Sequence, residues 1–208
     1  MSGAEPVIRP YRASDRDAVA EVCLRTAAAG GDASGVYRDD TLMPEVYALP
    51  YVDYAPDLAF VVELDGRVAG YVLGVADTAD FMEWYAREWA PAFRRRHPVA
   101  GPPTEYRPAY TEAQLIADGG DPERMRIPEL DAYPAHLHID LLPELQGRGL
   151  GRRLIDTLRA ALAERGVPAV HLGLDAANVG ARAFYARLGF HELASSRPEA
   201  PRLGIPTT

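Results

Sequence analysis

Three glycines lie within five residues of this chain, at Gly147, Gly149 and Gly151, in the sequence QGRGLGRRLI. An apolar run precedes them, and an amphipathic, arginine-rich run follows. A glycine-rich turn between a strand and a helix presents free backbone N–H groups at the positive end of the helix dipole, where phosphate or pyrophosphate binds. A Cβ would hold the anion away from these amides, and some positions need positive φ. The loop therefore predicts an anion site.

Other glycine-rich loops differ from this one in detail. A nucleotide-binding P-loop ends in Gly-Lys followed by Ser or Thr, whereas Arg152 and Arg153 follow here. A dinucleotide-binding fingerprint needs its third glycine at position 152. A merely tight turn would need one glycine rather than three. A nucleotide-phosphate binder stays open as a remote alternative.

The strand expected over 135–142 alternates between apolar and polar residues. Successive side chains of a strand point to opposite faces, so His136, His138 and Asp140 share one face. A central strand covered on both sides should be apolar throughout. The polar face therefore predicts a cleft or a wet edge.

The first part of the chain predicts a strand, two helices and a hairpin, at residues 7–12, 15–27, 39–49 and 58–76. The second helix should end before Pro50, which cannot continue it. The hairpin is the clearest element, because two β-rich apolar runs flank Asp65 and Gly66, a pair suited to a tight turn.

Residues 77–134 differ from the rest in composition, with frequent proline and glycine. The aromatic residues of this segment include Trp84, Tyr85, Trp89, Tyr106, Tyr110 and Tyr133. We expect a helix in FMEWYAREWAPAF that ends at Pro91, a solvated RRRH run over 94–97, and a short helix in TEAQLIADGG. A structureless loop of this length is improbable inside a compact domain. The segment therefore predicts an inserted subdomain that packs on the core.

From residue 135 onward, strands and helices alternate. The pattern predicts a helix over 152–166, a strand over 170–175, a helix capped by Asn178 and closed by Gly189, and a final strand pair. Such an alternation requires at least one parallel strand pair with a right-handed crossover. The fold class is therefore α/β.

The chain has 208 residues, of which 48% are hydrophobic and 25% charged, which suits one globular domain over 1–208. A net charge of -8 argues against a nucleic-acid binder. Cys23 is the single cysteine, which rules out an internal disulfide and suits a reducing compartment. No apolar run reaches the ~20 residues of a membrane span, and the N-terminus lacks a secretory h-region. We expect a cytoplasmic protein with no metal site.

Two motifs together indicate a family. Leu141-x-Pro143-x-x-Gln146-x-x-Gly149-x-Gly151 resembles the coenzyme A pyrophosphate loop of the general-control-related N-acetyltransferases, the GNAT family. NVGARAFYARLGF, over 178–190, resembles the second hallmark of that family, an Asn followed seven residues later by Tyr and then Leu-Gly-Phe.

The resemblance to this family is close over 135–190 and loose over 7–76. It implies a GNAT-type mixed sheet flanked by helices, with the aromatic-rich helical insertion, about 77–134, between strands 3 and 4. The stretch over 70–98 resembles the acetyltransferase-like C-terminal domain of O-GlcNAcase, so bacterial relatives of that domain are the nearest match. In animals that domain is regarded as a pseudo-acetyltransferase, whereas this sequence keeps both motifs intact.

The resemblance implies acetyl-CoA as co-substrate. In the family plan, the Leu141 amide donates to the thioester carbonyl and Tyr185 protonates the departing sulfur. Asn178 is either a plain helix cap or a coenzyme contact. The residues implied in coenzyme binding are Ile139, Leu141, Leu142, Gln146, Gly147, Arg148, Gly149, Leu150, Gly151, Arg152, Asn178, Phe184 and Tyr185.

The general base is the least defined part of the site. Some family members carry a Glu where this chain has Gly173, so that route is missing. His138 and Asp140 are the best candidates for base or proton relay, because a carboxylate attracts the ammonium and an imidazole with a pKa near ~6.5 can take its proton. The alternative for both is an ordinary structural role.

The function implied is acyl transfer from acetyl-CoA to a primary amine on a small molecule or peptide. The main alternative, from another class, is a catalytically silent acetyl-CoA-binding pseudo-acetyltransferase or interaction module. The sequence does not identify the acceptor or the oligomeric state.

Overall fold

The computed structural model describes residues 5–98 and 111–208. A seven-stranded mixed sheet crosses the molecule in the order β1-β2-β3-β4-β5-β7-β6. The strands are β1 (Val7–Pro10), β2 (Ala59–Leu64), β3 (Arg67–Val75), β4 (Ala135–Leu141), β5 (Ala169–Gly173), β6 (His191–Glu192) and β7 (Arg202–Pro206). The predicted α/β class, the strand positions and the final strand pair are confirmed.

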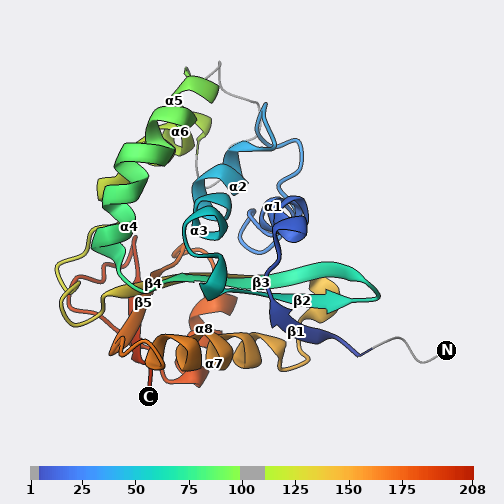
Figure 1. Ribbon diagram of the computed structural model, residues 1–208, viewed down its shortest axis with the longest axis vertical. Helices are drawn as coiled ribbons and strands as arrows, with labels where there is room; N and C mark the ends of the chain where they lie inside the picture. Colours follow the sequence, from blue (N-terminus) through green and yellow to red (C-terminus); the bar gives the residue numbers. More distant parts are fainter. Residues whose placement is uncertain (1–4, 99–110) are drawn as a thin grey trace.

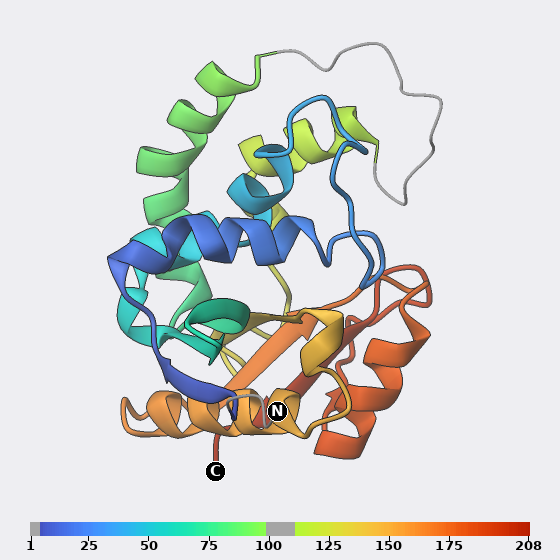
Figure 2. The same ribbon diagram turned by 90° about the vertical axis from the view of Figure 1, so that its right-hand side faces the viewer.

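Helices cover both faces of the sheet (Figure 1). One layer holds α1 (Arg16–Leu24), α2 (Leu42–Tyr47) and α3 (Leu49–Tyr54), and the opposite layer holds α7 (Leu150–Ala163) and α8 (Val179–Leu188). The side view in Figure 2 shows the same two layers, with the insertion helices rising beyond the first. Side chains from both layers pack on the central strands, which are buried along most of their length.

The local signals in the sequence explain most of these elements. Asp65 and Gly66 adopt φ values of 50° and 77°, as a tight hairpin turn between β2 and β3 requires. On α7, the predicted apolar stripe is buried against the sheet through Leu154, Ile155, Leu158 and Leu162. At Gly74 of β3, a Cβ would lie 2.8 Å from the Leu158 side chain, so any other residue would displace Leu158 from its present position.

One expected helix end, before Pro50, is confirmed, and the other, at Pro91, is wrong. α2 ends at Tyr47, and Pro50 lies in the first turn of the next helix, α3. Pro91 likewise lies in the first turn of α5 (Ala90–Arg96), which continues from α4 (Thr78–Trp84) through one π-helical turn, Tyr85–Trp89. A first-turn residue has no intrahelical N–H partner to lose, so proline is tolerated there.

The insertion occupies the predicted place between β3 and β4. Besides α4 and α5 it contains α6 (Glu112–Gly120), which Thr111 caps through its side chain. Its aromatic residues pack on the core, with Phe81 4.8 Å from Tyr51 and Trp84 5.1 Å from Tyr54 between ring centroids. Tyr106 and Tyr110 lie outside the described residues.

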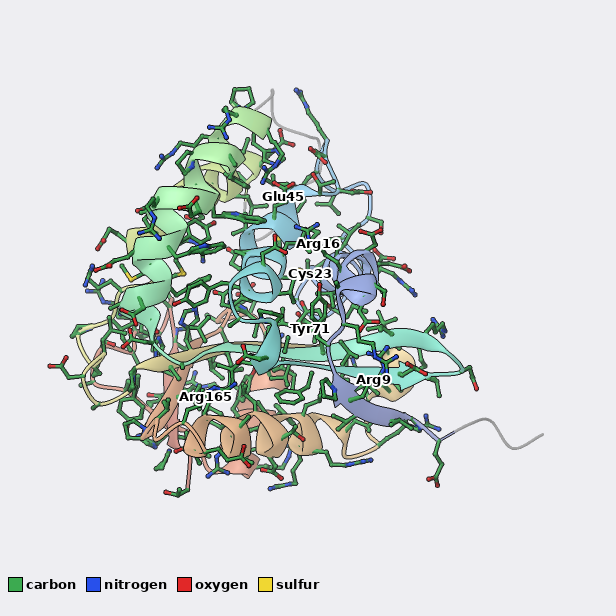
Figure 3. All side chains as sticks on the ribbon, viewed as in Figure 1. Arg9, Arg16, Cys23, Glu45, Tyr71 and Arg165 are labelled. Carbon is green, nitrogen blue, oxygen red and sulfur yellow. The ribbon has the colours of Figure 1, made fainter. Side chains whose placement is uncertain are left out.

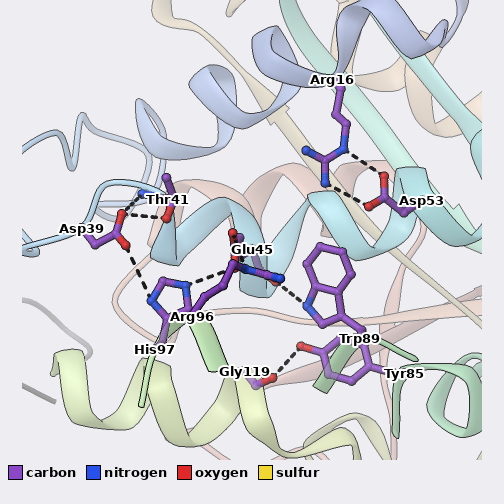
Figure 4. A network of polar contacts seen from close by, with 10 residues as sticks. All are labelled: Arg16, Asp39, Thr41, Glu45, Asp53, Tyr85, Trp89, Arg96, His97 and Gly119. Atoms are coloured by element: carbon purple, nitrogen blue, oxygen red, sulfur yellow. Dashed lines mark hydrogen bonds and ion pairs between the residues drawn. The ribbon is translucent and has the colours of Figure 1, made fainter. Parts of the chain in front are cut away.

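The three arginines at the end of α5 are exposed, as expected, whereas His97 is buried and both Arg96 and His97 contact α2. Arg96 pairs with Glu45 of α2 at 2.8 Å. His97 is buried, with its Nε2 3.1 Å from the Glu45 carboxylate and its Nδ1 3.6 Å from Asp39 (Figure 4). Trp89 also donates to the Glu45 carbonyl at 3.0 Å. These contacts join the insertion to α2.

The central feature for function is a gap in the sheet. β4 and β5 run parallel, as predicted, but pair only through Ala135 with Val170 and His136 with His171. Beyond these two pairs the strands separate, while β4 stays paired with β3 up to Leu141. The second half of β4 therefore presents one backbone edge to an open space.

Candidate active site

Two cavities meet at the gap between β4 and β5. One, of about 640 Å³, lies along the glycine loop and α8, and we call it the loop cavity. The other, of about 420 Å³, lies between β4, β5 and the insertion, and we call it the polar cavity. The residues that line both are Thr26, Ala29, Gly30, Asp140 and Asn178. Groups bound in the two cavities would therefore meet beside Asp140.

The glycine loop has the geometry of an anion site. Gly147 and Gly149 adopt φ values of 71° and 74°, and a Cβ at either position would face open space. Gly151 is needed for another reason, because a Cβ there would lie 2.9 Å from the Phe184 ring. The loop ends at the N-terminus of the 14-residue helix α7, whose dipole favours negative charge. Arg152 also lines this cavity.

Most of the residues expected to bind a coenzyme line the loop cavity. They are Ile139, Leu141, Gln146, Gly147, Gly149, Leu150, Gly151, Arg152, Asn178, Phe184 and Tyr185. Two expected residues are placed elsewhere. Leu142 is buried with its amide bonded to the Ala69 carbonyl at 3.0 Å, and Arg148 is exposed outside the cavity lining.

The backbone of β4 explains why Leu141 faces the gap. Because Leu142 donates to β3, the alternation of an antiparallel ladder turns the N–H and C=O of Leu141 away from β3. Gln146 reaches back and donates to the Leu141 carbonyl at 3.1 Å, on the side of the gap. The Leu141 amide therefore faces the space where a carbonyl oxygen could accept from it.

Tyr185 lies on α8 and lines the loop cavity with its ring packed between Phe184 and Phe190, each 5.1 Å away between centroids. Burial raises the pKa of its hydroxyl above the ordinary value of 10.0, and the nearby Asp140 carboxylate raises it further. Tyr185 is therefore protonated at neutral pH and can donate. Asn178 caps α8 by accepting from the Ala181 amide at 3.0 Å.

Asp140 stands where the two cavities join. Its carboxylate accepts a hydrogen bond of 2.5 Å from Tyr71, its cross-strand partner on β3. Burial raises the pKa of Asp140 from 3.8 to about 6, although hydrogen bonds from Tyr71 and Thr26 oppose the rise. Tyr71 points toward α1, where Cys23 lies beside it (Figure 3). A carboxylate titrating near pH 6 can take a proton at neutral pH and return it to solvent.

A chain of hydrogen bonds fixes the proton positions on the two histidines of β4. Thr78 gives its hydroxyl hydrogen to the Pro134 carbonyl at 2.6 Å, so its oxygen accepts from Nδ1 of His136 at 2.8 Å. His136 is neutral, because burial above all lowers its pKa well below 6.5, so its Nε2 accepts from the Tyr51 hydroxyl at 2.9 Å.

The same chain then reaches His138. The Tyr51 oxygen has given away its hydrogen, so it accepts from Nε2 of His138 at 3.0 Å. The partners thus assign the proton of His138 to Nε2 and leave Nδ1 as an acceptor. His138 lines the polar cavity and can receive a hydrogen bond from a ligand there.

The expected pKa of His138 near the ordinary imidazole value is wrong. Burial, and then the charge of Arg124, lower the pKa of His138 to about 3. An imidazole keeps its ordinary pKa of ~6.5 only where water can surround its charged form. The ring of His138 instead lies against the rings of Tyr47 and Tyr51. Of the two candidate bases, Asp140 is the one with the suitable pKa.

The polar cavity carries both signs of charge. Besides Asp140, its acidic residues are Asp118, Asp175 and Glu199, and its arginines are Arg124 and Arg202. Asp118, Arg124, Met125 and Ile127 come from the insertion, so the insertion forms one wall of this cavity. Trp84 and Trp89, the most prominent aromatic residues of that segment, are not part of the lining.

Within residues 5–98 and 111–208, no group of three or more His, Cys, Asp or Glu side chains is arranged to hold a metal ion. Over the same residues, every helix is too short or too polar to cross a membrane.

Several residues that contact the polar face of β4 could not be identified from the sequence. Tyr71 lies on β3, and the whole insertion separates β3 from β4 in the sequence. The pairing of Tyr71 with Asp140 therefore could not be predicted from their spacing along the chain. Tyr51 and Thr78 reach β4 only through tertiary packing. Arg124 is one of 22 arginines, and its enclosure alone distinguishes it.

Known proteins resemble this chain in sequence and in structure. Residues 126–190 match the model of the acetyltransferase (GNAT) family. The crystal structure of SsHAT is 48% identical, with a TM-score of 0.88, and the match covers 99% of this chain and 100% of SsHAT.

More distant structures share the fold. The PaiA N-acetyltransferase from Thermoplasma acidophilum, solved in complex with coenzyme A, is 12% identical, with a TM-score of 0.58 and coverage of 98% of this chain and 99% of its own. YncA from Salmonella typhimurium, solved with its cofactor acetyl-CoA, is 16% identical, with a TM-score of 0.55 and coverage of 98% and 94%. At these identities the likeness shows the fold alone.

Proposed function

The chain belongs to the acetyltransferase (GNAT) family, and from that premise we propose that it is an acyltransferase that moves the acetyl group of acetyl-CoA to a primary amine. The single observation that supports this most strongly is the meeting of the loop cavity and the polar cavity at Asp140. A transferase needs its two substrates to approach from separate openings and to touch at one point.

Acetyl-CoA fits the loop cavity by shape and charge. Gly147 and Gly149 line the loop cavity at the start of α7, and a Cβ at either position would meet open space, which suits a pyrophosphate held by the loop amides. Arg152 and Arg187 line the same cavity and add positive charge. The Leu141 amide faces the gap, where it would donate to the thioester oxygen as that oxygen becomes negative.

Two side chains carry the proton transfers of the reaction, and a third orients the amine. Acetyl-CoA supplies the activated acetyl group, and the amine must lose a proton before it attacks. Asp140, with a pKa of about 6, holds the ammonium and takes its proton, while Nδ1 of His138 accepts a hydrogen bond that orients the nitrogen. Tyr185 then gives its hydroxyl proton to the departing thiolate.

The finer placement of the chain within its family rests on residues 70–98. Their likeness to the acetyltransferase-like C-terminal domain of O-GlcNAcase leads us to propose a bacterial relative of that domain. Activity separates an enzyme from a silent acetyl-CoA binder, and it is measured as release of free CoA thiol together with formation of an N-acetyl amine. The expected cytoplasmic location stays a prediction.

Coenzyme binding can be tested at the glycine loop. We expect Gly149→Asp to weaken acetyl-CoA binding roughly 30- to 100-fold, because the new carboxylate adds bulk and negative charge where the pyrophosphate meets the amides. Titration calorimetry measures the affinity. Gly166→Asp is the matched control, since Gly166 also has positive φ (73°) and open space around it, but lies past the end of α7.

The control should bind acetyl-CoA as the wild type does. Unchanged affinity in a folded Gly149→Asp protein, or an equal loss in both variants, would remove the phosphate role from this loop.

A further inference from the structure

A partly buried arginine in the polar cavity has no role in the acetyl transfer described so far. Arg124 lies in the 3-10 turn Pro122–Met125 and lines the polar cavity. One guanidinium nitrogen, Nη2, donates to the Val46 carbonyl at 2.9 Å. The guanidinium carbon lies 5.2 Å from the ring centre of Tyr47 and 6.0 Å from that of Tyr85. The hydroxyl oxygens of Tyr51 and Tyr85 also accept hydrogen bonds from the guanidinium, so aromatic residues and one carbonyl surround the charge.

The guanidinium lacks a matching negative charge in the protein. Among the described residues, no carboxylate forms an ion pair with it within 4.0 Å, and its enclosed Nε has no hydrogen-bond partner. Asp118 lines the same cavity but forms no ion pair with the Arg124 guanidinium. Burial raises the pKa of Asp118, and the charge of Arg124 offsets part of that rise. An enclosed charge is costly unless it is paired, so a ligand anion would relieve it.

Arg124 lies along the cavity from the proposed base. It stacks on Tyr47, whose ring centre is 5.8 Å from that of His138. His138 and Asp140 are two residues apart on one face of β4, about 7 Å along the strand. A path along the cavity lining therefore runs from the Arg124 guanidinium past Tyr47 and His138 to the Asp140 carboxylate.

We propose, on the basis of the proposed function, that the acceptor is a small aminocarboxylate. Arg124 receives its carboxylate through paired N–H donors, and Asp140 receives its ammonium group. The acceptor must reach from Arg124 past Tyr47 and His138 to Asp140, so we assign it an amine and a carboxylate joined by three to five methylene groups. Of the two arginines that line this cavity, Arg124 and Arg202, only Arg124 has an enclosed nitrogen without a hydrogen-bond partner.

The reaction balances with this acceptor. The amine nitrogen forms the new amide bond and the thioester C–S bond breaks. The nitrogen gives up two protons, the first from the ammonium group to Asp140 before the attack and the second from the tetrahedral intermediate to solvent as the C–S bond breaks. Tyr185 gives one proton to the thiolate, so one proton is released to solvent overall. Both groups are reset from solvent, and the products are an N-acetyl aminocarboxylate and free CoA.

Matched pairs of amines test the proposal. Free-CoA release is measured with 4-aminobutyrate against butylamine, 5-aminopentanoate against pentylamine, and 6-aminohexanoate against hexylamine. We expect kcat/KM to be at least tenfold higher for the aminocarboxylate in the best pair, as a charge-assisted ion pair provides. In Arg124→Met that ratio should fall to about one. In Arg126→Met it should stay at the wild-type value, because Arg126 is exposed and pairs with Glu123 on the same turn.

Two results would overturn the assignment. One is a ratio near one for every pair in the wild type, which needs no variant. The other is a high ratio that persists in an Arg124→Met protein with a cooperative melting transition.

Failure of the proposed function looks different. If no amine of either kind releases CoA, then calorimetric titration of 5-aminopentanoate and pentylamine into the protein with CoA still decides the assignment. A tenfold preference for the aminocarboxylate supports it, and equal affinities overturn it.

Discussion

Replacement of Tyr185 by phenylalanine is expected to lower kcat roughly 100-fold, the usual contribution of one general acid. The ring keeps its packing against Phe184 and Phe190, but the proton for the departing thiolate is gone. The affinity for acetyl-CoA should barely change, because the hydroxyl acts on the sulfur only as the bond breaks. Pre-steady-state kinetics, under conditions where chemistry limits the rate, measures the loss.

Tyr133→Phe is the matched control for this variant. The Tyr133 hydroxyl contacts His191 at 2.8 Å and lines neither cavity, so kcat should stay at the wild-type level. If Tyr185→Phe keeps nearly full kcat as well, Tyr185 is a packing residue and the thiolate is protonated by another group.

Replacement of Asp140 by asparagine is expected to lower kcat/KM for the amine roughly 10²- to 10⁴-fold. The ordinary reference pKa of 3.8 is raised to about 6 in this site, and the base works only when ionised. For the wild type, kcat/KM should therefore rise about tenfold per pH unit below pH 6 and level off above it. Asp140→Asn should lose this limb while acetyl-CoA binding is retained.

Tyr71→Phe gives a second test of Asp140, because it predicts the direction in which the pKa of that carboxylate should change. The Tyr71 hydroxyl donates to the ionised carboxylate and so holds the pKa of Asp140 down. Without that donor the pKa should rise, so the limb should move to higher pH. Asp156→Asn, at an exposed position of α7, should leave the profile unchanged. If the rise of kcat/KM with pH stays at the same pH in both Tyr71→Phe and Asp140→Asn, a group other than Asp140 deprotonates the amine.

The glycine loop over 147–151 could be predicted because its conformation depends on residues that are adjacent in the sequence. Positive φ at Gly149, the cap at Asn178 and the turn at Asp65 and Gly66 each depend on a few consecutive residues, and all three occur as the sequence indicates. The polar face of β4 could also be predicted, since strand alternation alone places His138 and Asp140 together.

The protonation states of His138 and Asp140 depend on residues that are distant in the sequence, so they could not be predicted from the sequence. Tyr51 sets the proton position on His138, and burial raises the pKa of Asp140 while Tyr71 opposes the rise. These contacts form only when the sheet and the layer above it have assembled. The same reason accounts for the wrong pKa expected for His138, because burial cannot be judged from one strand. The helix end expected at Pro91 fails because proline both ends helices and begins them.

The central claim is that Asp140 joins a coenzyme cavity to an amine cavity in an active acetyltransferase. The most direct measurement follows free CoA thiol and the N-acetyl product together, by absorbance and mass spectrometry, with acetyl-CoA and 5-aminopentanoate at pH 7.5. We expect equal amounts of CoA and N-acetyl product, formed by the wild type and nearly abolished in Asp140→Asn. Tight acetyl-CoA binding without CoA release above buffer hydrolysis, with this or any other primary amine, would contradict the account and leave a silent acetyl-CoA-binding protein.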